Sequence, residues 1–339
     1  MTMEQHKVTG LVAHRLRVEC TAETAIVLPP VRGPVLRGAL VGALLADFCP
    51  VRGGEGCGSP DLAAACPVCT LLASGEEGQG AEGTRAKRDD GRHGVDAPRP
   101  FTIEPPLGGN GAVAPGDPLL FGLTLFGDSV GLFPYLLAGI ARMGQAGIGD
   151  RHAAPGRFRP REVWAIDPLQ GAQQRLMSDL EETMAMPDLP ITHAAVLERA
   201  ARLPGDVVAL ELLTPLRLVT EGRLVHRLTF QALLRRLLRR LDQLSLATTG
   251  QGLDIPFSQL VEAASAVRVA ADETRWLDAS SHSSRTGRTT PIGGLVGRVV
   301  FTGDLAPFLP WLVWGEIIHV GKDATKGNGW YRLSRAQSG

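Results

Sequence analysis

The chain has 339 residues, enough for one large or two ordinary domains, and 44% of them are hydrophobic, enough for a packed core. Basic and acidic residues balance at 35 each, which argues against a uniformly basic nucleic-acid binder. Aromatic residues make up only 5% of the chain, which argues against broad surfaces for stacking bases.

Charge is unevenly distributed along the chain. From Pro204 onward there are 16 basic and 12 acidic residues, whereas the first 203 residues carry 19 and 23. We therefore expect any polyanion to bind mainly to the second half. The chain lacks an apolar run of about 18 residues, which predicts no membrane span. Its polar start lacks a signal-peptide core, so we expect a cytoplasmic protein with reduced thiols.

The first half of the chain alternates between strand and helix patterns. Helical spacing of apolar residues predicts helices over 35–48 and 132–143. The predicted strands cover 8–20, 101–104, 118–126 and 158–166. Between the first helix and the second strand, the chain is rich in glycine, alanine and charge, and we interpret 74–98 as a flexible loop.

The same order returns in the second half. Thr229 is a suitable N-cap for a leucine-rich helix over 229–244, and a second helix is predicted over 305–317. The predicted strands here cover 207–219, 266–270, 294–302 and 330–333. Both halves thus have the βαββαβ order of the split βαβ fold, which predicts an α+β protein of two tandem ferredoxin-like, RRM-like domains.

We place the domain boundaries from these patterns. The expected N-terminal ferredoxin-like domain covers 1–170, with a cysteine-containing insertion at about 49–100. A helical connector is expected over 171–203, and the C-terminal ferredoxin-like domain over 204–339.

A glycine-rich loop lies between the last predicted helix and strand. Gly321, Gly327 and Gly329 permit positive φ angles and leave room for a phosphate, while Lys322 and Lys326 add positive charge. A tight helix-to-strand connection would need the same glycines. The loop differs from a phosphate-binding P-loop, because no strand precedes it and no Gly-Lys-Ser/Thr opens a following helix.

The surroundings of this loop resemble a known family. The run from Phe308 to Tyr331 contains His319-Val320-Gly321-Lys322, then the glycine-rich loop, then Trp330-Tyr331. It resembles the C-terminal signature of the CRISPR-associated RAMP endoribonucleases that process precursor CRISPR RNA. Further segments with the same resemblance are 28–40, 98–106, 116–127, 213–218 and 293–297.

The resemblance implies a fold, a reaction and partners. Members of the family have two tandem ferredoxin-like domains with a cleft between them. They cut repeat RNA without a catalytic metal, by attack of the 2′-hydroxyl, and leave a 2′,3′-cyclic phosphate and a 5′-hydroxyl. The partners implied here are a CRISPR repeat stem-loop and other CRISPR effector subunits. The alternative is a non-catalytic RAMP subunit that binds guide RNA.

Histidines are the natural candidates for proton transfer in such a reaction. His319 adjoins the glycine-rich loop, although it could instead fix that loop structurally. His282 lies in a polar run with Ser283 and Arg285, where relatives carry an Arg-Tyr-Ser-Ser-Arg-like sequence and the tyrosine is replaced here. Arg285 matches the second arginine of that run and is a candidate phosphate clamp. His226, just before the arginine-rich helix, is a third candidate.

Arginines on two predicted helices are candidates for contact with RNA. Four arginines of the second half recur at i, i+1, i+4 and i+5, which predicts that they share one face of the helix. This face would suit the binding of a repeat stem, and the alternative is a solvated flank of the helix. These residues are Arg235, Arg236, Arg239 and Arg240. Arg37, on the first helix, is a candidate for the cleft.

Four cysteines gather in one short window. Cys49, Cys57, Cys66 and Cys69 could bind a structural zinc ion, since a Cys-x-x-Cys pair is a common part of tetrahedral sites. Unligated, reduced cysteines are the alternative. We expect no catalytic metal, because no carboxylate and histidine group accompanies these thiols.

Overall fold

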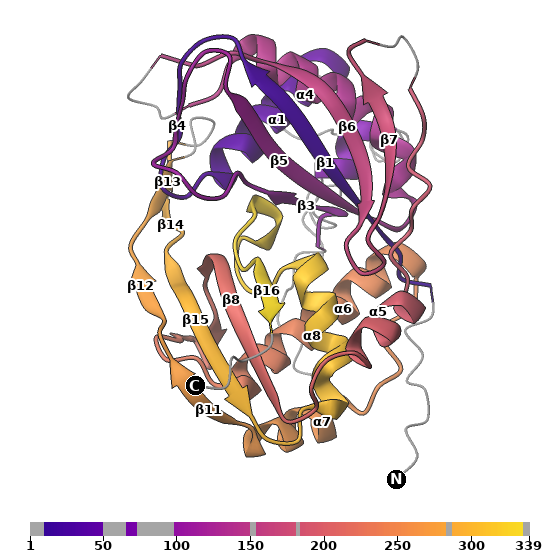
Figure 1. The fold of residues 1–339 in the computed structure, drawn as a ribbon, viewed down its shortest axis with the longest axis vertical. Coiled ribbons are helices and arrows are strands. Elements are labelled where there is room, and N and C mark those ends of the chain that lie inside the picture. Colours follow the sequence, from indigo (N-terminus) through magenta and orange to yellow (C-terminus); the bar gives the residue numbers. More distant parts are fainter. Residues whose placement is uncertain are drawn as a thin grey trace, which may run out of the picture.

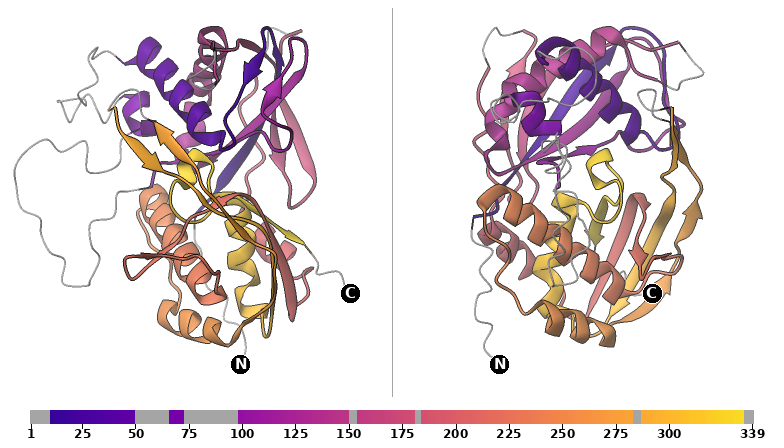
Figure 2. Two further views of the ribbon diagram at one scale, coloured as in Figure 1. Left: turned by 90° about the vertical axis from the view of Figure 1, so that its left-hand side faces the viewer. Right: turned by 180° about the vertical axis from the view of Figure 1, so that it is seen from behind.

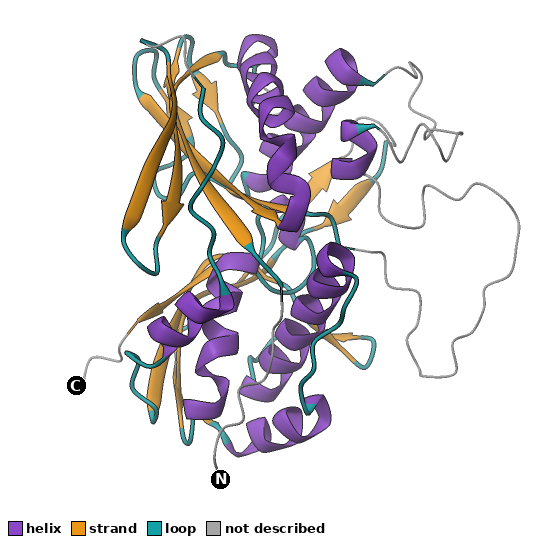
Figure 3. Ribbon diagram, turned by 90° about the vertical axis from the view of Figure 1, so that its right-hand side faces the viewer, coloured by secondary structure: helices purple, strands orange, loops and turns teal. Residues whose placement is uncertain are grey.

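The computed structural model describes two sheets, each with helices on one face. The described residues are 10–49, 66–72, 98–149, 154–180, 184–282 and 287–334. Figure 1 shows the two halves one above the other, and Figure 3 shows that both sheets lie on one side of the molecule and the main helices on the other. The view from behind in Figure 2 shows the helices covering the sheets.

The first half forms an antiparallel sheet in the order β3-β5-β1-β6-β7. Its strands are β1 (Ala13–Ala22), β3 (Phe101–Glu104), β5 (Pro118–Phe126), β6 (Phe158–Asp167) and β7 (Ala172–Ser178). The helices are α1 (Gly33–Phe48), the short α3 (Pro67–Leu72) and α4 (Phe133–Ala146), with a 3-10 turn η1 (Gly127–Leu132). A small hairpin pairs β2 (Ile26–Val27) with β4 (Ala112–Val113).

The second half repeats this arrangement in the order β11-β15-β8-β16. Its strands are β8 (Val207–Leu216), β11 (Arg268–Asp272), β12 (Arg275–Leu277), β15 (Gly294–Thr302) and β16 (Tyr331–Ser334). The helices are α5 (His193–Ala200), α6 (Phe230–Thr249), α7 (Phe257–Ala263) and α8 (Leu309–Ile318), with 3-10 turns η2 (Ala264–Ala266), η3 (Ala306–Phe308) and η4 (Ala324–Lys326). Two small hairpins pair β9 (Val219–Thr220) with β10 (Arg223–Leu224), and β13 (Ser280–His282) with β14 (Thr289–Pro291).

The order of elements confirms the predicted α+β architecture. In each half, the first strand lies between the third and fourth strands of its βαββαβ unit, as the split βαβ fold requires. The segment expected as a helical connector contains α5, and it also contains strand β7, which extends the first sheet.

Local chemistry explains the longest helix. The side chain of Thr229 accepts a hydrogen bond from the Ala232 N–H, as expected of an N-cap, and Gly250 ends α6 in the left-handed conformation with φ of 73°. The leucine stripe of α6 lies in the core of the second half. That core also takes in Leu11, Ala13 and Phe126 from the first half, so the two halves are packed together.

Candidate functional site

The glycine-rich loop is a packed element between the two halves. Figure 1 shows it in yellow just before β16, below β3. The hydroxyl of Thr214 donates to the Gly327 carbonyl at 2.7 Å and accepts from the Trp330 N–H at 2.9 Å. The Gly329 N–H donates to the Pro215 carbonyl at 3.0 Å. These bonds fix the loop to the end of β8.

Glycine is required where this loop meets the first half. Gly327 has φ of 88°, and an added Cβ would lie 2.7 Å from the Ile103 carbonyl oxygen. On the other side of the contact, a Cβ on Gly33 at the start of α1 would overlap the Lys326 carbonyl. The loop therefore wedges against both β3 and the first turn of α1.

A cavity of about 140 Å³ lies beside this contact, between the two halves. The first half contributes Arg32, whose guanidinium donates to the carbonyls of Pro106 and Gly109 at 3.0 and 2.9 Å. Burial lowers the pKa of Arg32. The cavity is lined by Pro30, Val31, Arg32, Gly33, Pro105, Pro106, Leu107, Gly108, Gly109, Leu213, Thr214, Pro215, Leu277, Val296 and Asn328.

The two lysines of the loop differ in how they are engaged. Lys322 is exposed, whereas the Lys326 ammonium pairs with the Asp323 carboxylate at 2.7 Å. Within the loop, the N–H groups of Lys326 and Gly327 donate to the carbonyls of Asp323 and Ala324. Because these donors are already used, the exposed Lys322 is the clearest anion-binding group of the loop.

His319 lies inside the protein, directly before the loop. Its exposed fraction is 0%, and its φ of 59° is unusual for a residue other than glycine. The ring stacks on Trp330 with centroids 5.6 Å apart and an interplanar angle of 11°. Within the described residues, neither ring nitrogen has a hydrogen-bond partner. Burial, together with the charges of Arg240 and Arg15, holds the pKa of His319 well below its usual value.

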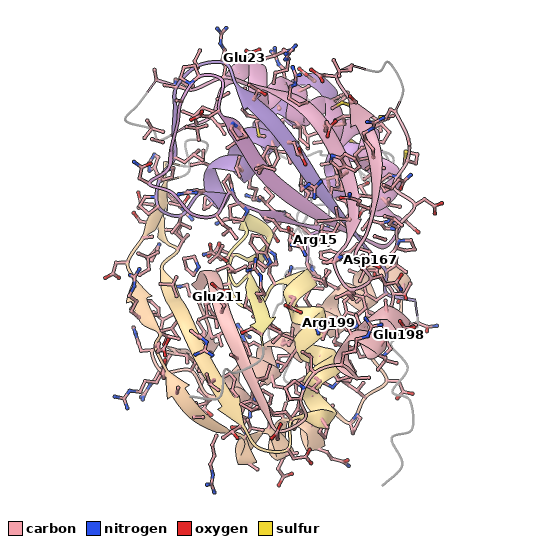
Figure 4. All side chains as sticks on the ribbon, in the orientation of Figure 1. Arg15, Glu23, Asp167, Glu198, Arg199 and Glu211 are labelled. Carbon is pink, nitrogen blue, oxygen red and sulfur yellow. The ribbon has the colours of Figure 1, made fainter. Side chains whose placement is uncertain are left out.

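Two arginines surround this buried histidine. Arg240 donates from Nε to the Ile318 carbonyl at 2.8 Å, and burial lowers its pKa to about 10. Arg15, on β1, pairs with Glu104 at 2.7 Å and lies over the Trp330 ring at 5.5 Å. Figure 4 shows Arg15 where the two halves meet. Arg15 of the first half thus contacts Trp330 of the second half, and Arg240 is bonded to the end of α8 just before His319.

The other arginines of α6 lie in different surroundings. Arg235 and Arg239 line a cavity of about 320 Å³ between α6 and α7. Burial and the charge of Arg239 lower the pKa of Arg236. Arg37 is half-buried on α1. Arg235, Arg236 and Arg239 thus lie near one another on α6, whereas Arg37 belongs to α1 in the other half.

His282 lies on β13, far from the core. It is exposed, and its Nδ1 lies 3.1 Å from the Thr289 hydroxyl across the β13–β14 hairpin. Figure 2 shows that this hairpin extends from the second sheet toward the first half. The predicted neighbours Ser283 and Arg285 lie outside the described residues.

A further group of side chains lies at the glycine-rich loop, and the sequence singled out two of its four members. The His226 ring packs on Trp276 with centroids 4.4 Å apart, and the Arg217 guanidinium lies 5.9 Å from the Trp276 ring centroid. The Lys322 N–H donates to the Arg217 carbonyl at 2.9 Å. We call Arg217, His226, Trp276 and Lys322 the His226 cluster. The pairing of β12 with β15 builds it, and no local sequence pattern signals that pairing.

The cysteine window is only partly described. Cys49 caps the end of α1, and Cys66 and Cys69 lie at α3, while Cys57 falls outside the described residues. In the described part of the chain, no group of three or more His, Cys, Asp or Glu residues could hold a metal ion. The four-cysteine zinc site stays a prediction, since Cys57 lies outside the described residues.

Comparison with known proteins agrees with this architecture. A family model described as an N-terminal domain matches residues 11–189, and the model of the CRISPR-associated endoribonuclease Cas6 matches residues 210–331. No curated protein gives a significant match. None of the helices in the described residues is long and apolar enough to cross a membrane.

Several solved structures share the fold. The chain is 14% identical, with a TM-score of 0.59, to a chain of a partial Cas6-RT-Cas1–Cas2 complex, covering 97% of this chain and 47% of that one. It is 18% identical, with a TM-score of 0.53, to a Cas6 product complex, covering 95% of this chain and 100% of that one. The chain is also 16% identical, with a TM-score of 0.52, to Thermus thermophilus Cas6, covering 96% of this chain and 100% of that one.

The comparisons show which class of protein shares this fold. The chain spans about half the length of the first of these structures and the whole length of the other two. Tandem ferredoxin-like domains are confirmed, as is the resemblance seen in the sequence. Residues 210–331 match the model of the Cas6 endoribonuclease family, and the chain as a whole has the fold of solved Cas6 structures.

Proposed function

We propose that the protein binds the repeat stem-loop of precursor CRISPR RNA and cuts it once to release guide RNA. The observation that carries this proposal is the glycine-rich loop, which lies in the Cas6-family domain and wedges against α1 and β3 of the other half. A cavity adjoins that contact, and Lys322 of the same loop is exposed. RNA lying along this junction would contact both halves.

The proposed cut uses the RNA as its own nucleophile. The 2′-hydroxyl attacks the neighbouring phosphorus, the bond to the 5′-oxygen breaks, and the products are a 2′,3′-cyclic phosphate and a 5′-hydroxyl. Such a reaction needs a proton acceptor, a proton donor and cations beside the phosphate. None of these roles requires a catalytic metal ion.

The cations of the second half would hold the RNA backbone. Lys322 is the exposed lysine of the loop, and Arg235 and Arg239 line the cavity between α6 and α7. Phosphate contacts of this kind bind a stem through charge and shape rather than through base sequence. Arg240, by contrast, would act by supporting His319 and the junction, because its Nε is already bonded to the Ile318 carbonyl.

The histidines predicted from the sequence would have different roles. His319 is fully buried, so we assign it to positioning the glycine-rich loop rather than to contact with RNA. His282 is exposed and could reach RNA. Its proposed catalytic role with Ser283 and Arg285 stays a prediction.

A second candidate function is a non-catalytic RAMP subunit that keeps guide RNA in a larger assembly. Such a subunit needs no group for proton transfer, so the burial of His319 agrees with it as well. The similarity to a chain of a Cas6-RT-Cas1–Cas2 complex also suits a role beside other CRISPR proteins.

One assay separates the two candidates. The purified protein is incubated in EDTA with labelled repeat RNA, and in parallel with the same RNA carrying a 2′-deoxy nucleotide at the cut site. We expect cleavage of the first RNA only, with a cyclic phosphate on the upstream product. Tight binding without cleavage of either RNA would favour the non-catalytic subunit. Zinc analysis of the same preparation, compared with a Cys57→Ser variant, tests the predicted structural metal site.

A further inference from the structure

The described residues contain three histidines that are held by other contacts. His14 and His319 are buried. His193 accepts a hydrogen bond at Nδ1 from the Trp314 indole at 3.0 Å, and its ring is stacked against the same side chain. Burial keeps His14 and His319 away from an RNA bound at the surface, and His193 is half-buried with its Nδ1 already bonded.

His226 and His282 are the exposed histidines of the described chain. His282 has its Nδ1 beside the Thr289 hydroxyl. His226 is held differently, by the face of its ring against Trp276, with centroids 4.4 Å apart and planes inclined by 41°. Among the described residues, no hydrogen-bond partner of its ring nitrogens is found, so both remain available to a substrate.

Trp276 is itself fixed, which makes it a firm support for His226. Its indole N–H donates to the Asp278 carboxylate at 2.9 Å, and its ring packs against the core of the second half. The pairing of β12 with β15 places Trp276 opposite Leu295. The His226 ring is therefore held in place without using either nitrogen, which is what a proton acceptor requires.

The same cluster supplies positive charge at the glycine-rich loop. The Arg217 guanidinium lies over Trp276 and donates to the Gly293 carbonyl at 3.1 Å. The backbone of Arg217 is bonded to Lys322, whose side chain is exposed. Trp276 contacts both Arg217 and His226, so direct contacts link the glycine-rich loop to the exposed imidazole.

The described contacts of the two exposed histidines differ. His282 lies beside Thr289 within the β13–β14 hairpin, whereas the contact of His226 with Trp276 leads on to Arg217. His226 is therefore the exposed histidine that is linked by direct contacts to the anchor of the glycine-rich loop.

We propose that His226 is the catalytic base of the RNA cut, with Trp276 as its positioning residue and Arg217 and Lys322 as the phosphate clamp. This proposal rests on the proposed endoribonuclease function. Neutral His226 accepts the proton of the 2′-hydroxyl as the 2′-oxygen bonds to phosphorus. The bond from phosphorus to the 5′-oxygen breaks, and that oxygen takes a proton from water. The products are a 2′,3′-cyclic phosphate and a 5′-hydroxyl.

The test compares single-turnover cleavage and RNA binding in EDTA for the wild type, His226→Ala and His282→Ala. We expect His226→Ala to lose about 100-fold or more in cleavage rate, the usual contribution of a general base, while its Kd for repeat RNA stays within about threefold. Trp276→Ala should lose rate as well, and Trp276→Phe should recover most of it. Melting curves check that each variant is folded.

A repeat RNA with a bridging 5′-sulfur at the cut site distinguishes a base from an acid, because a thiolate leaves without a proton donor. His226→Ala should stay slow on this RNA. Restoration of the wild-type rate would show that His226 is an acid and overturn the assignment. A wild-type rate for His226→Ala with a loss in His282→Ala would overturn it in favour of His282. If the wild type itself fails to cut, the proposed endoribonuclease function fails and the assignment falls with it.

Discussion

Glu316 on α8 should make the folding stability of the second half depend on pH. Its Oε1 accepts a hydrogen bond from the Leu333 N–H at 2.6 Å, which links α8 to β16. Burial raises the pKa of this carboxyl from 4.5 to about 7, even though the hydrogen bond from Leu333 and nearby arginine charges favour the ionised form. The buried side chain is therefore more stable neutral than charged.

The size of the effect follows from the two pKa values. One pKa unit is worth about 1.4 kcal/mol, so the shift from 4.5 to about 7 is worth about 3 kcal/mol. Because the pKa is raised in the folded protein, this stability is fully present below pH 4.5. It is lost as the pH rises toward and through 7, where folding must ionise a buried group.

Glu316→Gln isolates this effect, because the amide oxygen can still accept from Leu333 but carries no charge. Urea unfolding of both proteins is measured at pH 4.5 and at pH 8. We expect similar free energies of unfolding at pH 4.5 and a variant more stable by about 3 kcal/mol at pH 8. Groups common to both proteins cancel in the comparison. The same difference at both pH values would refute the reasoning.

Three further variants and one control variant test the glycine-rich loop. In α1, Gly33→Ala should destabilise the protein by at least about 1 kcal/mol, because the added Cβ would overlap the loop backbone. The control variant Gly38→Ala, whose added Cβ would have nothing within 4 Å, should stabilise the protein by about 0.5–1 kcal/mol. Thermal melting measures both, and melting temperatures that shift in the same direction would contradict this expectation. Thr214→Val should lower the free energy of unfolding by about 1–3 kcal/mol, because the Gly327 carbonyl and the Trp330 N–H would lose their bonds to the hydroxyl. An unchanged midpoint of urea unfolding would contradict this expectation. Lys322→Ala should weaken RNA binding and reduce its salt slope by about one, which filter binding at several salt concentrations measures, and an unchanged slope would exclude a phosphate contact.

Periodic elements with strong local signals could be predicted from the sequence. The strands at 101–104, 118–126 and 294–302 begin and end where alternation and turn residues place them. The start of α6 followed from Thr229 as an N-cap. Strand β7 was not predicted, because it lies at the sheet edge and mixes exposed Gln173 and Arg175 with few apolar residues.

The surroundings of the arginines on α6 were harder to predict. Spacing at i and i+4 places side chains on one flank of a helix, but it does not say which neighbouring element covers that flank. Here the C-terminal end of α8 covers Arg240, whereas Arg235 and Arg239 border α7. The contact of His226 with Trp276 joins residues 50 positions apart, so it depends on the completed sheet.

The positions of His319 and His226 suggest how a neutral chain with few aromatic residues can still handle RNA. His319 is adjacent to the glycine-rich loop in sequence, yet it is enclosed by Trp330, Arg240 and Arg15, where a protonated imidazole would be disfavoured by burial and by two like charges. Its neutral ring suits packing that holds the loop in place. His226 is distant from the loop in sequence, and it is exposed. Its ring packs on Trp276, which also contacts Arg217, and the Arg217 carbonyl accepts a hydrogen bond from Lys322 of the loop. Support of the loop and proton transfer would then fall to different histidines, so sequence distance from the loop is a poor guide to which of them touches the RNA.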